Sequence, residues 1–234
     1  MTQHWKKLVV VLLTLVVLVL AASFIYAKVI NKADDEFDSN DVKDRLTTTT
    51  ADRATDPATS DGVDGAWVIS DGSEVGYRVD ESINGFATTA NGRTTAVSGE
   101  FTVEGARVTG GEFTVDMTTF SSDEGRRDNA FNGRIMQVDT FPTATLVLTE
   151  VIEFGEVPED GTSIRATAIG DLTLHGVTKS VTFEVEATFE SGRIGVLGQI
   201  PVVFADYDIS DPSFASITTE DNGLLEFVLI FDRA

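Results

Sequence analysis

The sequence contains no cysteine and only two histidines, His4 and His175, among 234 residues. The absence of cysteine excludes disulfides, thiol nucleophiles and cysteine metal sites. Two histidines are too few for most zinc sites and most general-base arrangements. Positive charge is also scarce, because 17 Lys and Arg stand against 38 Asp and Glu, a formal charge of −21. Phosphate binding requires a basic surface, so this balance argues against nucleic acid as a partner.

Signatures of catalysis are missing as well. No G-x-S-x-G nucleophile elbow accompanies His175, and no glycine-rich phosphate loop precedes a helix. Acidic residues are numerous, but nothing in their spacing singles out a pair for glycoside hydrolysis. We therefore expect a protein that is not an enzyme, with no catalytic residue, no metal site and no cofactor.

One long apolar run occupies residues 8–27 and reads LVVVLLTLVVLVLAASFIYA. At about 1.5 Å per residue, a helix of this length spans about 30 Å, the thickness of a bilayer's hydrocarbon core. Trp5 and Tyr26 lie near its ends, where aromatic side chains favour the membrane interface. Because only seven residues precede the run, we expect residues 1–7 to be a cytoplasmic tail and the rest to lie outside the cell membrane.

A cleaved signal peptide is the alternative to this single-pass anchor. Val19-Leu20-Ala21 and Ile25-Tyr26-Ala27 each end in the small residue that signal peptidase sites require. The protein would then be secreted. The apolar run is longer than a usual signal core, which favours the anchor.

Residues 28–65 lack apolar periodicity and carry 5 basic and 10 acidic residues. Thr47 to Thr50 form a homopolymer. Such a stretch buries too little apolar surface to offset chain entropy, so we expect a disordered acidic linker.

Residues 66–234 show a different pattern, in which apolar and polar residues alternate over many segments. Phe113, Val115 and Met117, for example, are separated by Thr114 and Asp116. Period-two alternation predicts strands with one face inward and one face in water. The short links His175-Gly176 and Ser191-Gly192 predict hairpins. We expect an all-β fold, an eight-stranded antiparallel barrel, with a short helix over residues 122–137 that plugs one end, and Glu184, Glu186 and Glu190 on a solvated strand face.

Four blocks of this region carry a resemblance to a known family. They are Trp67-Val68-Ile69-Ser70 with Ser73-Glu74-Val75-Gly76-Tyr77-Arg78-Val79, Arg127-Asp128 with Phe141-Pro142-Thr143-Ala144-Thr145-Leu146, Gly170 to Lys179 (GDLTLHGVTK), and the closing strand Phe227 to Phe231. In this order they resemble the YceI-like family of polyisoprenoid-binding proteins. The resemblance implies a lipocalin-like barrel with an elongated apolar cavity that binds isoprenoid or fatty-type amphiphiles.

The resemblance also implies where a ligand binds. The expected cavity-lining residues are Phe101, Phe113, Val115, Met117, Phe131, Leu146, Leu148, Ala166, Ala168, Phe183, Val185, Ile200, Val202, Phe227 and Leu229. Tyr77, Arg127 and Asp128 are candidates for head-group contacts, although an ion pair that anchors the helix is the favoured explanation of Arg127 and Asp128. Two positions depart from the family pattern, since Glu81 and Ala130 stand where relatives usually have histidine. A head group held by those histidines elsewhere must be held differently here.

Two functions remain open at this point. The first is a membrane-anchored carrier that sequesters or transports a long-chain amphiphile, such as an isoprenoid quinone or polyprenyl lipid. The second is a structural or interaction protein of the envelope, whose barrel is filled by its own side chains. An eight-stranded barrel has the size at which either outcome occurs. Small inward residues such as Gly198 and Ala168 favour an open lumen.

Overall fold

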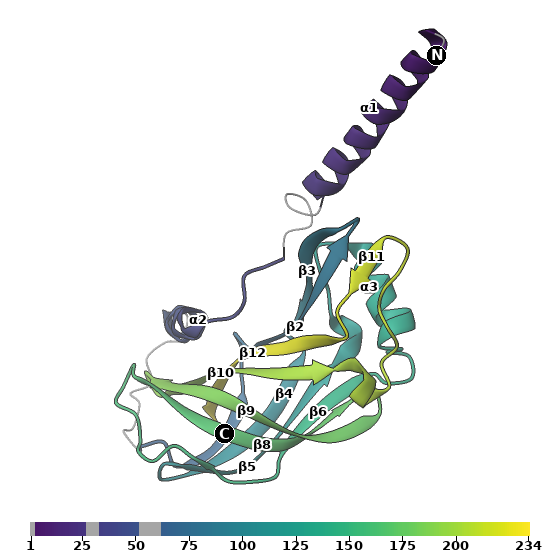
Figure 1. Ribbon diagram of the computed structural model, residues 1–234. Coiled ribbons are helices and arrows are strands. Elements are labelled where there is room, and N and C mark those ends of the chain that lie inside the picture. The colour runs from purple at the N-terminus through teal and green to yellow at the C-terminus, as the bar shows by residue number, and fades with distance from the viewer. Residues whose placement is uncertain (1–2, 27–32, 52–61) are drawn as a thin grey trace.

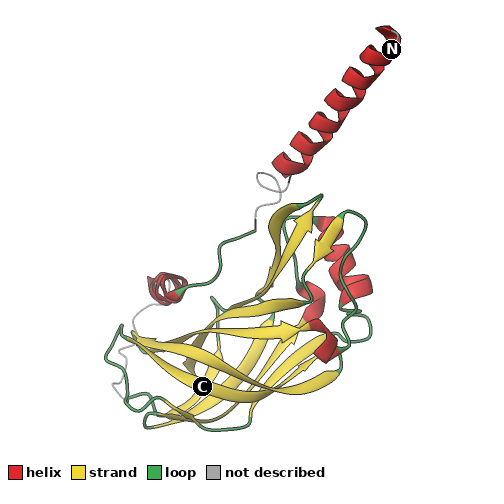
Figure 2. Ribbon diagram, in the orientation of Figure 1, coloured by secondary structure: helices red, strands yellow, loops and turns green. Residues whose placement is uncertain are grey.

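The computed structural model describes residues 3–26, 33–51 and 62–234, in which β-strands predominate (Figure 1, Figure 2). Eight antiparallel strands form a ring in the order β1-β4-β5-β6-β8-β9-β10-β12, and β12 pairs back with β1 to close it. The predicted closed eight-stranded barrel is therefore confirmed. Its strands are β1 (Gly65–Ile69), β4 (Val97–Glu104), β5 (Arg107–Asp116), β6 (Thr143–Leu148), β8 (Ser163–Leu174), β9 (Val177–Glu190), β10 (Arg193–Val203) and β12 (Asn222–Arg233).

A second group of strands extends one wall of the barrel. β2 (Glu74–Ile83) follows β1 along the same edge of β12 and pairs with β3 (Phe86–Thr94) and β11 (Ile217–Thr219). The short strand β7 (Ile152–Glu153) pairs with β5 at the opposite end. The β2–β3 turn, the helix α3 (Gly125–Ala130) and residues 210–217 surround one end of the barrel, which we call the mouth (Figure 1).

Tight turns fix the register of the hairpins. His175 and Gly176 have successive positive φ angles of 51° and 78°, and Ser191 and Gly192 have 55° and 77°. Two positive φ angles in a two-residue loop are the geometry of the type I′ turn, whose twist matches that of the flanking strands. The hairpin predictions are thus confirmed. The predicted helix within residues 122–137 is also present, as α3 followed by a single π-helical turn, Phe131–Ile135.

The first helix, α1 (Gln3–Ile25), contains the predicted membrane segment. Its stretch Trp5–Ile25 is long and apolar enough to cross a membrane, and its most apolar 18-residue window contains no buried residue. A signal sequence near an N-terminus has the same length and composition, so both alternatives stay open. Residues 1–2 of the predicted tail and residue 27 of the predicted span lie outside the described residues.

The prediction of a disordered linker over residues 28–65 is wrong for residues 33–51. Here the chain runs along the outside of the barrel and forms the helix α2 (Ser39–Ala51). Phe37, Val42 and Leu46 are buried against Val228 and Ile230 of β12. An isolated 13-residue helix is marginal in water, so this tertiary contact explains why the segment is ordered. We call residues 33–47 the strap; residues 28–32 and 52–61 of the predicted linker lie outside the described residues.

Candidate functional site: an apolar barrel cavity

The barrel encloses a cavity of about 870 Å³. This volume lies in the upper part of the range of roughly 300–1,000 Å³ that is typical of small-molecule sites. The inward rows of the strands supply its lining, because alternate side chains of each strand point to the same face. Phe113, Phe183 and Phe227 line the cavity without filling it. The lumen is therefore an open apolar space rather than a packed core.

A glycine on β10 keeps one of these rings against the wall. Gly198 is the cross-strand partner of Phe227, and a Cβ added at Gly198 would lie 2.2 Å from Cζ of the Phe227 ring. The ring therefore covers the backbone of its neighbour, an arrangement that glycine in an antiparallel pair permits. Phe227 lies 6.3 Å from Phe183 in an edge-to-face contact. Gly198 thus accommodates an aromatic ring beside β10 that would otherwise need room in the lumen.

Three aromatic rings form the wall of the cavity beneath the mouth. Tyr77 stacks on Phe131 with ring centroids 4.7 Å apart, and Phe120 lies 5.8 Å from Tyr77 and 5.3 Å from Phe131. Gly92 of β3 makes room for this cluster, since a Cβ there would lie 2.6 Å from the Tyr77 ring. Burial raises the pKa of the Tyr77 hydroxyl far above its usual range, although the nearby Arg127 acts in the opposite direction. Tyr77 is accordingly a neutral phenol at physiological pH.

Charged groups meet the apolar lumen beside this cluster. Arg127 lies on α3, and its guanidinium is 3.9 Å from the carboxylate of Glu81 on β2. The same guanidinium donates to the Asp123 carboxylate, four residues earlier in the chain. Arg127 and Glu81 both line the cavity, and the exposed fractions of their side chains are 15% and 9%. A ligand head group beside Arg127 would therefore meet one cation between two carboxylates, next to a neutral phenol.

The comparisons with known proteins agree with this geometry. A family model described as YceI-like domain matches residues 67–231. The chain belongs to the YceI-like family. A UPF0312 protein from Vibrio parahaemolyticus is 31% identical over 127 residues, and one from Pseudomonas putida (strain W619) is 33% identical over 133 residues. These alignments cover 50% and 52% of this chain and 64% and 65% of the relatives, less than two thirds of their length.

Two solved structures share the fold. A polyisoprenoid binding domain from Saccharophagus degradans, implicated in plant cell wall breakdown, superposes with a TM-score of 0.57 at 15% identity. That match covers 73% of this chain and 99% of that domain. BcnA from Burkholderia cenocepacia superposes with a TM-score of 0.54 at 19% identity and covers 68% of this chain and 95% of that one. At such identities the likeness establishes the YceI-like barrel and no more.

The sequence prediction of the lumen agrees closely with this YceI-like barrel. All the predicted lining residues except Ala166 line the cavity. Ala166 instead packs, half-buried, against the surrounding hydrophobic core, while its neighbours Ile164 and Ala168 reach the lumen. Contact of these residues with a lipid stays a prediction.

The candidates for head-group contact divide into two groups. Tyr77 and Arg127 line the cavity, as predicted, and Asp128 does not. The carboxylate of Asp128 accepts hydrogen bonds from the backbone N–H of Ser122, at 2.9 Å, and from its hydroxyl, at 2.6 Å. Asp128 therefore stabilises the turn that leads into α3. The predicted ion pair between Arg127 and Asp128 is not formed, because Arg127 pairs with Asp123 and Glu81.

Sequence reasoning missed several residues of the YceI-like mouth. Tyr26, Arg126, Arg134 and Phe214 all line the cavity at this end. They come from the residue after α1, from α3, from the π-helical turn that follows it and from the loop before β11, none of which alternation along strands predicts. Glu81 and Ala130, the two departures from the family pattern, line the cavity as well. The two positions that the sequence singled out therefore lie at the cavity.

The contacts of His175 are with residues that shape the fold, away from the cavity. Its Nδ1 lies 3.1 Å from the carbonyl oxygen of Tyr207, and its ring packs on Phe141 with centroids 4.5 Å apart. It lies outside the cavity lining. Within residues 3–26, 33–51 and 62–234, no group of three or more His, Asp or Glu side chains is arranged to hold a metal ion.

Proposed function

We propose that the barrel binds one long-chain amphiphile of the isoprenoid type in its lumen and sequesters or transports it without catalysing a reaction. The observation that carries this proposal is the open apolar cavity of about 870 Å³. The relative from Saccharophagus degradans, described as a polyisoprenoid binding domain, supports the same ligand class. The alternative, a structural protein whose barrel is filled by its own side chains, is less favoured because the lumen is open.

The apolar tail supplies most of the binding energy in this proposal. Burial of a CH₂ group is favourable by about 0.8 kcal/mol, so one five-carbon isoprene unit contributes on the order of 3 kcal/mol. Three such units offset the cost of association and still give roughly micromolar affinity. The lining from Phe101 to Phe231 offers aromatic and branched aliphatic side chains along the whole lumen, which suits a branched, unsaturated chain.

The charges around Arg127 favour a neutral head group at that position. Arg127 stands between the carboxylates of Glu81 and Asp123, so its charge is already compensated. An anionic phosphate there would approach two carboxylates for one cation, whereas a quinone or alcohol accepts or donates single hydrogen bonds beside Tyr77. Arg126 and Arg134 also line this end of the cavity, so a phosphate would have to bind beside them instead. We therefore propose a neutral isoprenoid, such as a quinone, with its head group beside Tyr77 and Arg127.

We place this barrel at the outer face of the cytoplasmic membrane, held by α1 as a single-pass anchor. The length and composition of the apolar stretch Trp5–Ile25 support this placement. Secretion after signal cleavage is the alternative. Mass determination of the protein purified from membranes distinguishes them, because an intact N-terminus supports the anchor.

The test of the lipid-binding proposal is extraction of the purified full chain with solvent, followed by mass spectrometry of the lipids. We expect one amphiphile per barrel in the natural protein. Ala168→Trp places an indole in the lumen, because Ala168 is fully buried and lines the cavity. Thr167→Trp is the matched control, since Thr167 is exposed on the other face of β8. Loss of lipid in Ala168→Trp alone supports the proposal, and an empty natural barrel that takes up no added quinone contradicts it.

A further inference from the structure

The end of α1 lies directly against the mouth of the barrel. The Ser23 hydroxyl accepts a hydrogen bond from the side-chain amide of Asn84 at 3.0 Å. Phe24 packs edge-on against Phe86, with ring centroids 5.5 Å apart. Asn84 belongs to the turn between β2 and β3, and Phe86 begins β3. The apolar helix therefore lies nearest the mouth (Figure 1), the end at which Tyr26, Arg127 and Phe214 line the cavity.

A loop with an exposed aromatic side chain continues this surface. The backbone N–H of Asn84 donates to the carbonyl of Ser216 at 2.9 Å, which joins the β2–β3 turn to the loop before β11. Phe214 in this loop is 69% exposed and also lines the cavity. The guanidinium of Arg134 lies 5.7 Å from the Phe214 ring and donates to the carbonyl of Pro212, which supports the loop. An exposed phenylalanine beside a membrane helix suits the bilayer interface.

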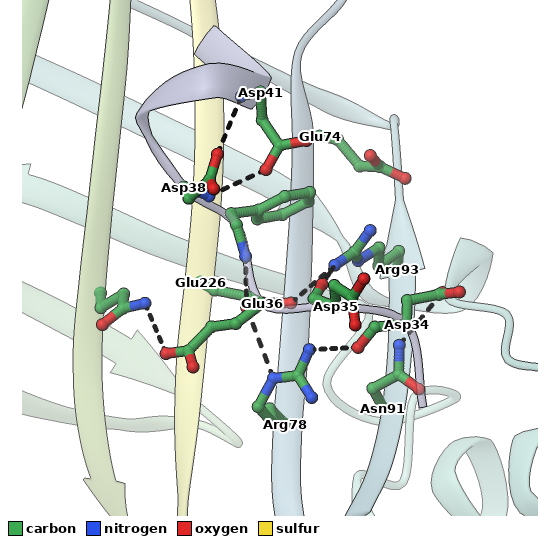
Figure 3. A network of polar contacts seen from close by, with 12 residues as sticks. Asp34, Asp35, Glu36, Asp38, Asp41, Glu74, Arg78, Asn91, Arg93 and Glu226 are labelled. Carbon is green, nitrogen blue, oxygen red and sulfur yellow. Dashed lines mark hydrogen bonds and ion pairs between the residues drawn. The ribbon is translucent and has the colours of Figure 1, made fainter. Parts of the chain in front are cut away.

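The strap fixes the barrel close to α1. The side chain of Arg78 donates to the carbonyl of Asp34 at 2.6 Å, and Arg93 donates to the carbonyl of Asp35 (Figure 3). Beneath them, the backbone N–H of Phe37 donates to Glu226 at 3.3 Å. The strap is thus anchored to β2, β3 and β12 from Asp34 onward.

The chain between these two fixed points is short. Asp34 follows Ile25 by nine residues, which reach at most about 32 Å when fully extended. The strands of the ring are long by comparison, since β9 has 14 residues and measures about 45 Å. The far end of the barrel therefore points away from the helix. A tether this short limits how far the domain can turn while the strap stays bound, and the contacts of Ser23 and Phe24 hold the mouth at the end of α1.

We propose that the mouth rests on the bilayer surface around the end of α1, so that an amphiphile passes between the membrane leaflet and the lumen without crossing water. The inference rests on the proposed lipid-binding function and adds a fixed orientation to it. The covalent anchor is what brings the mouth to the membrane, because residues 66–234 carry 28 acidic and 10 basic residues and are repelled by an anionic surface.

The absence of native cysteine gives a direct test. Phe214→Cys labels the mouth, and Val157→Cys labels the far end, where the neighbouring Asp160 accepts a hydrogen bond from Ser191 in the β9–β10 turn. Both positions are exposed in the natural protein and both line the cavity, so the two labels match in their contact with the lumen and differ in the end of the barrel at which they lie. Each full-length variant, carrying an environment-sensitive fluorophore, is reconstituted in phosphatidylcholine vesicles with and without a spin-labelled quencher lipid. We expect a blue shift and several-fold stronger quenching at position 214 than at position 157.

Equal quenching at the two positions, stronger quenching at position 157, or a full chain that fails to associate with vesicles overturns the proposal. A second variant tests the tether as the cause. Insertion of about 20 Gly and Ser residues after residue 30 adds roughly 25 Å of average reach without altering the strap. We expect it to remove most of the difference between the two positions, and an undiminished difference contradicts the role of the strap.

The lipid extraction above keeps this proposal separate from the proposed function. A barrel that contains an amphiphile but shows equal quenching keeps the function and loses the orientation. A barrel that shows the expected quenching but never holds an amphiphile keeps the orientation and loses the function.

Discussion

The two faces of β12 have opposite environments although their residues are direct neighbours in the chain. Phe227 and Leu229 face the lumen and line an open cavity. Val228 and Ile230 face outward, where the strap covers them so completely that neither has any exposed surface. In most antiparallel barrels the outward face of a strand is wet. In β12 the inward face borders an open cavity, and the outward face is covered by the strap.

This difference separates two tasks within one strand. The outer face holds the strap and thereby the position of the domain relative to α1, so it is packed as densely as a protein core. In the proposed function the inner face receives a ligand, and without one its side chains lack partners on the side of the lumen. Substitutions on the two faces should therefore affect different measurements.

The largest expected effect comes from the buried carboxylate under the strap. Glu226 has no exposed surface and lies 3.2 Å from Arg93 and 3.6 Å from Arg78. Removal of one partner from a buried ionic cluster costs about 3 kcal/mol or more. We predict that Glu226→Ala lowers the free energy of unfolding by about 3 kcal/mol, as measured by urea denaturation with fluorescence of the buried Trp67. Glu184→Ala, on the exposed part of β9, is the control, and equal stability of the two variants would contradict the prediction.

Truncation on each face of β12 compares the faces directly. Ile230→Ala removes contacts in the closed strap interface and should cost about 3 kcal/mol. Leu229→Ala enlarges a space that is already open, so the loss should be about 1–2 kcal/mol in the ligand-free protein. Addition of the bound amphiphile should increase the cost of Leu229→Ala and leave that of Ile230→Ala unchanged. Equal costs in the ligand-free protein would mean that the lumen is packed like the strap interface.

The sequence predicted the lumen well and the strap poorly, and the reasons are physical. Strict alternation over β5 and β8 determines which side chains share a face, so the inward rows follow from the sequence alone. The strap has only three apolar anchors, Phe37, Val42 and Leu46, in an acidic segment. Its docking depends on partners far along the chain, which a local pattern does not show.

One signal for the strap was present in the sequence. Residues 224–231 read LLEFVLIF and lose the alternation of the other strands, which is typical of a strand buried on both faces. That run predicts a cover on the outside of the barrel without identifying it. Alternation assigned Glu186 to a solvated strand face, and this prediction is wrong. Glu186 is buried beside the start of α2, whose position the local pattern does not show.

Two glycines of β10 offer a matched pair on opposite faces. A Cβ at Gly198 would meet the Phe227 ring at 2.2 Å, and a Cβ at Gly195 would meet Val42 of the strap at 2.4 Å. Overpacking of this kind costs about 1–3 kcal/mol. We predict that Gly198→Ala lowers the amount of bound amphiphile and leaves the strap protected from trypsin. Gly195→Ala should instead expose the strap to cleavage at Lys43 and leave lipid content unchanged, and the reverse pattern would contradict the assignment of the faces.

The smallest expected effect concerns pH and the start of α2. Partial burial acts to raise the pKa of Glu186, but hydrogen bonds from Ser39, Arg165 and Ser163 outweigh it, so the pKa lies below its usual range. A carboxyl group with a lowered pKa in the folded state stabilises the protein above its unfolded pKa, near 4.3, and this contribution disappears as the pH falls through the folded value. Because the Arg165 side chain is 71% exposed, the contribution is about 0.5 kcal/mol. Glu186→Gln should therefore be slightly less stable than the natural protein at pH 7, and the difference should shrink as the pH falls below about 4.3. Urea denaturation across this pH range measures the difference, and a difference that grows on acidification would show that the carboxylate is destabilising where it lies.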